Sequence, residues 1–337
     1  MRDCCLIEQP MCPSLPAPCN RLAVAVNRIP ELAQARIMPL QIVHHPHYDA
    51  GFAVNHRFPM SKYPLLMETL RGRGVAAPGA LSMPKPAPAL WLKRAHAGDY
   101  VDQVLACEVP ERIEREIGFP IGERVSLRAQ LATAGTVLAA RLALGHGIAC
   151  NAAGGSHHAR RAQGAGFCTF NDVAVASLVL LAEAVVENIL IVDLDVHQGD
   201  GTADILKDDP RVFTFSMHGE RNYPARKIAS DLDVALPDGT GDAAYLTRLG
   251  AVLPELSELS RWDLVFYNAG VDVHAEDKLG RLALSDDGLR ARDEMVIGHF
   301  RARGIPLCGV IGGGYSADVP ALAARHAILF EVAARFA

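Results

Sequence analysis

Long apolar segments are absent from this 337-residue sequence. No uninterrupted apolar run reaches the roughly 18–20 residues that a membrane-spanning helix needs. The first twenty residues carry Asp3 and Glu8 and contain no apolar core of the length found in signal peptides. These two absences predict a cytoplasmic protein without a membrane span.

A surplus of positive charge is also absent. Lysine and arginine total 33 residues against 38 aspartates and glutamates, which gives a formal net charge of −5. A chain with this balance has no long-range attraction for nucleic acid or for an anionic membrane surface. We therefore expect neither as a partner.

The eight cysteines lack the paired C-x₂-C spacing of a zinc finger. Half of them lie in a proline-containing stretch near the start of the chain, namely Cys4, Cys5, Cys12 and Cys19. The others lie in or near apolar segments and are expected to be reduced, buried thiols: Cys107, Cys150, Cys168 and Cys308.

Hydrophobic residues make up 50% of the chain, which is enough to form a large core. A plausible first strand follows Met38 directly. We therefore predict that residues 1–37 form a flexible N-terminal extension and that residues 38–337 form one domain, because no repeat or linker divides them.

Strand and helix patterns alternate along the second region. Short apolar runs predict strands at 39–45, 148–152, 189–192, 212–217, 232–236, 262–268 and 305–311. Helical spacing of apolar residues predicts helices at 63–70, 97–106, 127–144, 171–186, 242–260, 286–303 and 319–336, while the proline- and alanine-rich segment 76–89 is interpreted as a loop. This alternation is typical of an α/β fold with a mostly parallel central sheet covered by helices on both faces.

The segment NILIVDLDVHQGDG, residues 188–201, is the most informative stretch. An apolar strand ends there, and Asp193, Asp195, His197 and Asp200 follow within eight residues. Ligands of open α/β sheets bind at the carboxyl ends of the strands. Several carboxylates and an imidazole are costly to bury unless they are paired or hold a metal, so a metal site is favoured over a solvated loop.

Other polar residues follow other predicted strands and are expected at the same edge of the sheet. Asp195, His197 and Asp272 supply the nitrogen and oxygen ligands of a hydrolytic zinc site, which leaves a position for water. A helix-capping role for Asp272 is the alternative interpretation.

The tandem histidines His157 and His158 suit acid–base chemistry, and Asp193 and Asp200 suit the task of orienting them. A pair of surface histidines is the simpler alternative. Tyr315 follows three glycines, and its phenol there suits hydrogen bonding to an oxyanion, although packing beside a tight turn explains it equally well.

These residues stand in motifs that resemble the zinc-dependent histone deacetylase family, which has the arginase/deacetylase fold. The motifs are SHHA with GFCTFND, DLDVHQGDG, NAGVD and GGGY, in the family's order, and the resemblance covers residues 38–337. DLDVHQGDG, the Asn222-Tyr223-Pro224 loop and VFYNAGVDVHAEDKLGRLALS are most similar to the class IV, histone deacetylase 11-like group and its bacterial relatives.

The resemblance implies a role for each matching residue. It implies zinc bound by Asp195, His197 and Asp272, with iron as an alternative ion. It implies His158 as general base, His157 as a charge-stabilising group, Asp193 and Asp200 as their partners, and Tyr315 as donor to the oxyanion. It implies an acyl-lysine tunnel lined by Gly166, Phe167, Tyr223 and Gly313, and a potassium ion at Asp193, Asp195, His197, Ser216 and Met217.

The implied function is zinc-dependent hydrolysis that removes acetyl or longer fatty acyl groups from lysine side chains of proteins or peptides. A deacylase of small amines such as acetylpolyamines is the first alternative, and a non-catalytic sensor of acyl ligands is the second. An arginase-like site with two manganese ions is disfavoured, because Gly199 and His274 stand where that site needs further ligands.

One departure from the family concerns substrate binding. Class I members carry an aspartate at the pocket rim, and the HAGDY segment puts Gly98 or Asp99 at that position. The sequence leaves the oligomeric state open.

Overall fold

The computed structural model describes residues 39–53 and 56–337. The predicted N-terminal extension and Cys4, Cys5, Cys12 and Cys19 lie outside the described residues, so the domain boundary stays a prediction. Cys107, Cys150, Cys168 and Cys308 are free thiols, and all but Cys107 are buried.

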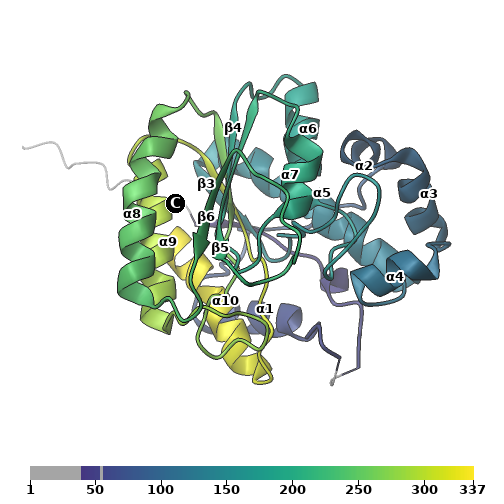
Figure 1. Ribbon diagram of the computed structural model, residues 1–337, viewed down its shortest axis with the longest axis horizontal. Helices are drawn as coiled ribbons and strands as arrows, with labels where there is room; N and C mark the ends of the chain where they lie inside the picture. Colours follow the sequence, from purple (N-terminus) through teal and green to yellow (C-terminus); the bar gives the residue numbers. More distant parts are fainter. Residues whose placement is uncertain (1–38, 54–55) are drawn as a thin grey trace, which may run out of the picture. The chain divides into compact units, whose positions relative to one another are not determined.

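An eight-stranded sheet forms the centre of the domain, and every neighbouring pair of its strands is parallel (Figure 1). The strand order is β2-β1-β3-β8-β7-β4-β5-β6. The strands are β1 (Gln41–Val43), β2 (Leu81–Ser82), β3 (Ile148–Asn151), β4 (Ile189–Asp193), β5 (Val212–Gly219), β6 (Leu232–Leu236), β7 (Leu264–Asn268) and β8 (Leu307–Val310).

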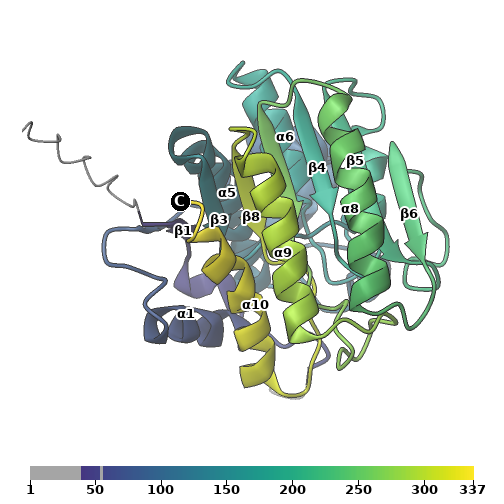
Figure 2. The ribbon, with the colours of Figure 1, turned by 90° about the vertical axis from the view of Figure 1, so that its left-hand side faces the viewer.

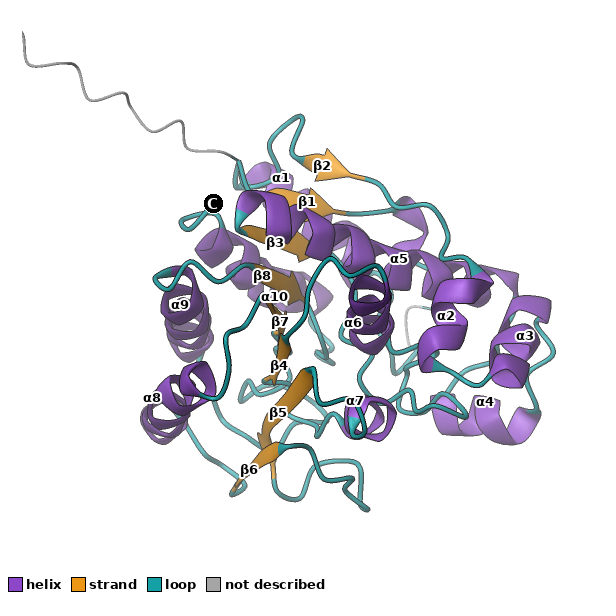
Figure 3. Cartoon of the chain, turned by 90° about the horizontal axis from the view of Figure 1, so that it is seen from above, coloured by secondary structure: helices purple, strands orange, loops and turns teal. Residues whose placement is uncertain are grey.

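Helices cover both faces of this sheet. They are α1 (Lys62–Gly72), α2 (Ala89–Ala95), α3 (Gly98–Ala106), α4 (Glu111–Ile117), α5 (Glu123–His146), α6 (Asp172–Ala182), α7 (Asp200–Leu206), α8 (Asp242–Glu258), α9 (Asp286–Arg301) and α10 (Val319–Ala333), with a 3-10 turn at Pro46–Tyr48. Helices α1, α8, α9 and α10 lie on one face, as Figure 2 shows, and α5, α6 and α7 lie on the other (Figure 3). The predicted fold class, a single α/β domain with a parallel sheet between helical layers, is therefore confirmed.

The prediction missed four short elements. The segment 76–89 is not wholly a loop, because Leu81 and Ser82 pair with β1 as the edge strand β2. Helices α2, α4 and α7 have seven residues each, too few for a clear helical period. Among the described residues, no helix is both long and apolar enough to span a membrane.

The strand order determines where the site forms. Strand β4 lies between β5 and β7 at the centre of the sheet, and all five of its residues are buried. Its last residue, Asp193, lies beside Ser216 of β5 and Asn268 of β7. Because parallel strands end at the same edge, the loops after β3, β4, β7 and β8 converge there.

Candidate active site

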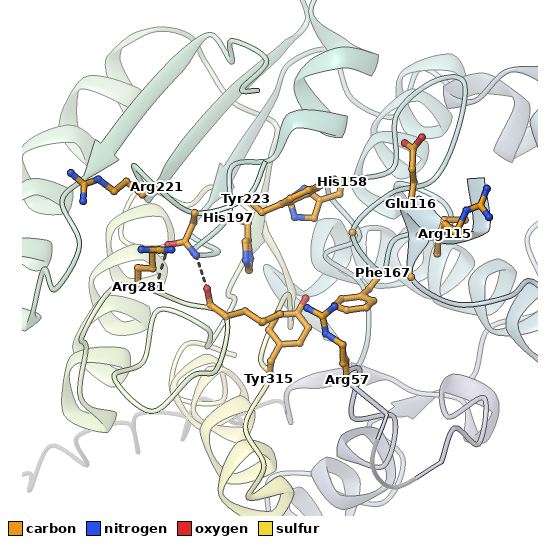
Figure 4. Close-up of a pocket in the computed structure, with 15 residues that line it drawn as sticks. Arg57, Arg115, Glu116, His158, Phe167, His197, Arg221, Tyr223, Arg281 and Tyr315 are labelled. Atoms are coloured by element: carbon orange, nitrogen blue, oxygen red, sulfur yellow. Dashed lines mark hydrogen bonds between the residues drawn. The ribbon is translucent and has the colours of Figure 1, made fainter. Parts of the chain in front are cut away.

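The polar residues predicted from separate strand ends lie together in the structure. Around one cavity of about 390 Å³ stand His158, His197 and Tyr315 with Phe167 and Tyr223 (Figure 4). They come from the loops after β3, β4, β5 and β8, which are distant in sequence.

Asp195, His197 and Asp272 place one potential ligand atom each within 4.8 Å of the others, and all three are buried. The Nδ1 atom of His197 lies 3.0 Å from Oδ1 of Asp195 and 3.1 Å from Oδ2 of Asp272. The backbone N–H of Gly313 donates to Asp195 at 2.7 Å, and that of Val196 donates to Asp272 at 2.9 Å. These bonds leave both carboxylates able to face a common ion.

The electrostatics of this trio suit a cation. Burial alone would lower the pKa of His197, but hydrogen bonds to Asp195 and Asp272 outweigh it and raise this pKa to about 10. Burial, with the charge of Asp195 beside it, raises the pKa of Asp272 to about 7. Two carboxylates in a buried space call for a positive charge between them, and one imidazole with two carboxylates is a zinc- or iron-type donor set.

Each tandem histidine bonds its own aspartate. Nδ1 of His157 lies 2.6 Å from Asp193, and Nδ1 of His158 lies 2.6 Å from Asp200. Burial opposes charge on both rings. Asp193 and Asp195 outweigh it at His157 and raise this pKa to about 9, whereas burial and the charge on His157 lower the pKa of His158 to about 4.

The asymmetry arises because Asp195 adds its negative charge to that of Asp193 at His157, whereas the charge of His157 opposes protonation of His158. The two aspartates also differ in their remaining partners. Asp200 also accepts hydrogen bonds from Arg160 at 2.6 and 2.9 Å, and the guanidinium neutralises its charge. Asp193 accepts an N–H of the Asn268 side chain at 2.9 Å, a neutral donor. Asp193 therefore keeps more of its negative charge for its histidine. The sequence interpretation did not single out Arg160 or Asn268.

Tyr315 lines the cavity and is 8% exposed to solvent. Burial and the charges of Asp195 and Asp272 raise its pKa well above the usual value, so the phenol keeps its proton. Its backbone N–H donates to Asp277 at 2.7 Å. Asp277 also accepts the N–H groups of Leu279 and Gly280 and thus ties two loops together, a role that no sequence signal indicated.

The predicted tunnel residues line or border the cavity. Phe167 lies with its ring centroid 5.6 Å from that of Tyr315, and Tyr223 lies 4.7 Å from His158. A Cβ at Gly166 would fall 2.6 Å from His158, and one at Gly313 would fall 2.1 Å from Asp272. Both glycines therefore permit close approach to the reacting groups.

The predicted rim position is wrong. Gly98 begins α3 and Asp99 follows it in the first turn, and neither is among the residues that line the cavity. The HAGDY segment forms the start of helix α3, whereas Arg115 and Glu116 of helix α4 line the cavity. The described rim residues that the sequence interpretation missed are Arg57, Arg115, Glu116, Arg221 and Arg281.

Two further predictions concern ions. Ser216 and Met217 are buried on β5 beside the end of β4, close to the predicted potassium position, and the ion itself stays a prediction. His274 lies 3.3 Å from Asp286 at the start of α9 and accepts the backbone N–H of Glu276 in its own loop, and it does not join the trio.

Arg292 of α9 supports the ligand loops from behind. Its buried guanidinium donates to the carbonyl of Gly270 at 2.6 Å and lies 3.4 Å from that of Leu194. Asp293 pairs with the same guanidinium at 2.9 Å. These contacts join the segments that carry Asp195 and Asp272.

Comparison with known proteins agrees with this geometry. The family described as "Histone deacetylase domain" matches residues 56–330. An uncharacterised protein of Picosynechococcus sp. is 45% identical over 88% of this chain and 99% of its own length. Histone deacetylase 2 of Arabidopsis thaliana is 32% identical over 82% of this chain and 74% of its own length.

The fold agrees as well. The crystal structure of the HDA15 HD domain superposes with a TM-score of 0.71 at 23% identity, over 88% of this chain and 89% of that one. The chain therefore belongs to the histone deacetylase family of deacetylase hydrolases.

Proposed function

We propose that this protein is a zinc-dependent amidohydrolase that removes acyl groups from lysine side chains. The observation that supports it best is the combination of a buried Asp195–His197–Asp272 trio with two separate His–Asp pairs at the base of one cavity. A non-catalytic sensor would not require both pairs.

The proposed roles follow from protonation and contact. Asp195, His197 and Asp272 would hold a divalent ion, and such an ion would supply the chemistry of a lowered water pKa and a polarised acyl carbonyl. Asp200 accepts a hydrogen bond from Nδ1 of His158, so that Nε2 of His158 is free. This nitrogen takes the proton of the attacking water and passes it to the leaving ε-amine.

The other two groups stabilise charge. His157, protonated beside Asp193, offsets negative charge that develops in the transition state. The phenol of Tyr315 donates a hydrogen bond to the tetrahedral oxyanion. Phe167 and Tyr223 flank the aliphatic part of the acyl-lysine.

The finer assignments are also proposals. The similarity of the motifs to class IV members motivates tests with fatty acyl groups as well as acetyl. Potassium at Asp193, Asp195, His197, Ser216 and Met217 would stabilise the end of β4. The free cysteines among the described residues fit a reducing compartment, which supports a cytoplasmic location.

The test is hydrolysis of acyl-lysine peptides from acetyl to myristoyl, with acetylpolyamines in parallel. Wild type, Tyr315→Phe and a chelator-treated sample are compared. We expect chelator-sensitive cleavage that zinc restores, and a loss in kcat on the order of 10²-fold for Tyr315→Phe with metal retained. Zinc-loaded protein that cleaves no acyl-lysine peptide would refute the proposal.

A further inference from the structure

The rim of the active-site cavity carries more positive than negative side chains, although the whole chain has a net charge of −5. Four arginines line the cavity together with a single carboxylate; they are Arg57, Arg115, Arg221 and Arg281, with Glu116. Figure 4 shows them on opposite sides of the cavity, with Arg221 and Arg281 beyond His197 and with Arg115 and Glu116 beyond Phe167.

Ion pairs within the protein neutralise only part of this charge. Arg221 and Arg281 share one carboxylate, Asp238, at 3.9 and 3.2 Å. One positive charge of the two guanidiniums is therefore left over.

The pairs on the other side are balanced. Arg115 pairs with Glu111 at 2.9 Å, and Glu116 pairs with Arg112 at 3.1 Å. Arg57 is exposed and has no ion-pair partner among the described residues. The left-over charge therefore comes from Arg57 and from the Arg221–Arg281 side.

A second cavity, of about 570 Å³, continues the basic surface past Tyr315. It shares Arg57, Leu279 and Tyr315 with the first and adds the exposed Lys278 and the half-buried His56. Within the described part of the chain, its lining contains no aspartate or glutamate. The charged side chains that a substrate meets when it extends from the catalytic cavity along this side are those of Arg57 and Lys278, which are both cationic.

We propose that the preferred substrates are acyl-lysine peptides with aspartate or glutamate next to the acyl-lysine. This inference rests on the proposed deacylase function. An acidic side chain near the modified lysine lies close to Arg57 and Lys278 on one side or to Arg221 and Arg281 on the other. A polyamine brings further ammonium groups to the same rim, and like charges at an interface disfavour binding.

The experiment measures kcat/KM for one acyl-lysine peptide in three forms, with the two residues on either side of the acyl-lysine being glutamate, glutamine or lysine. We expect glutamate above glutamine above lysine, with about tenfold between the extremes at low salt. Because the rim charges are exposed, salt screens their interaction with the peptide. The spread in kcat/KM should therefore shrink as the salt concentration is raised from about 20 to about 500 mM. N-acetylspermidine serves as the cationic small amine.

Charge-reversal variants identify the rim residues that determine the preference for acidic peptides. Arg57→Glu should reduce the ratio of the glutamate to the lysine peptide to near one or below, and Arg281→Glu should do so to a smaller extent because Asp238 already offsets part of its charge. Arg248→Glu is the matched control, since Arg248 is exposed on α8 and does not line either cavity. It should leave the ratio unchanged.

The outcomes separate the two proposals. Equal turnover of the three peptides, or a preference for lysine or for N-acetylspermidine, overturns the inference about substrate charge and leaves the deacylase function standing. An acidic preference that Arg57→Glu and Arg248→Glu change equally also overturns it. Absence of turnover for every peptide by zinc-loaded protein refutes the proposed function instead.

Discussion

The floor and the rim of the active-site cavity are built in opposite ways. On the floor, Asp193, Asp195, Asp200 and Asp272 are all at most 3% exposed and each accepts hydrogen bonds from identified donors. On the rim, arginines such as Arg57 and Arg281 are exposed. Hydrogen bonds in a low-dielectric floor fix geometry, whereas exposed charges act over longer distances and are screened by salt.

The difference indicates a division of tasks. We propose that the floor, where a misplacement is costly, serves the chemical step. We propose that the exposed rim, where substitutions usually change stability little, serves the choice of substrate. Substitutions on the floor should therefore change kcat or metal content, and substitutions on the rim should change the order of substrates.

The largest effect is expected from a ligand of the trio. Asp195→Ala removes a buried carboxylate that lies 3.0 Å from His197, so the protein should lose stoichiometric zinc and its activity should fall to background. Metal content by atomic spectroscopy and peptide hydrolysis give the two readouts. Asp209→Ala, which removes an ion pair with Arg211 away from the cavity, is the control. Full zinc occupancy in Asp195→Ala would remove this residue from the ligand set.

The second-largest effect is expected from replacing the tandem histidines, His157 and His158. His158→Ala should lower kcat more than His157→Ala, because burial lowers the pKa of His158 to about 4 and keeps the ring neutral and able to accept a proton. His157, with a pKa raised to about 9 by Asp193 and Asp195 against burial, is already protonated at neutral pH. Single-turnover rates of zinc-loaded variants decide the order, and the reverse order would exchange their roles.

A smaller effect tests a floor residue that touches no substrate. Asp277→Asn should lower kcat about tenfold, since one of the acceptors that hold the Tyr315 backbone and the neighbouring loop is replaced by an N–H donor. Zinc content should not change. If Asp277 acts by positioning Tyr315, the same substitution in a Tyr315→Phe background should cost much less. An equal loss in both backgrounds would mean that Asp277 acts through general stability.

The difference between floor and rim also explains which features of the site can be predicted from the sequence. Asp195, His197 and Asp272 follow apolar strands, and a local pattern locates strand ends, so the amino-acid sequence alone predicts the fold class and the trio. Asp277 and Arg292 bond across loops and helices far apart in sequence, and no local period records such contacts.

The rim is the least predictable part. The resemblance of the HAGDY segment to the family assigns Gly98 or Asp99 to it. Two of the residues that line the rim, Arg115 and Glu116, come instead from helix α4, a seven-residue element whose exposed charges resemble those of any surface helix. Local sequence patterns report burial, and rim side chains are not buried.

The smallest expected effect concerns a floor charge that lacks a carboxylate partner. Lys62 is 1% exposed, and its Nζ lies 3.5 Å from the carbonyl of Gly314 and 5.2 to 5.8 Å from the ring centroids of Phe58, Tyr63 and Tyr315. Among the described residues no aspartate or glutamate pairs with it. Burial, followed by the charge of Arg128, lowers its pKa to about 8.

A lysine whose pKa is lower in the folded than in the unfolded state destabilises the fold most at pH values below both. This cost is fully present below pH 8 and disappears as the pH approaches the unfolded pKa of about 10.4. Lys62→Met should therefore raise the free energy of unfolding at pH 7 by about 1 kcal/mol, after the lost contacts with the three rings are deducted. Urea unfolding at pH 7 and pH 10, with exposed Lys85→Met as control, measures both values. A gain in the free energy of unfolding that is equal at the two pH values, or a loss at pH 7, would mean that the rings and the Gly314 carbonyl compensate the buried charge. The floor would then contain no unbalanced charge at this position.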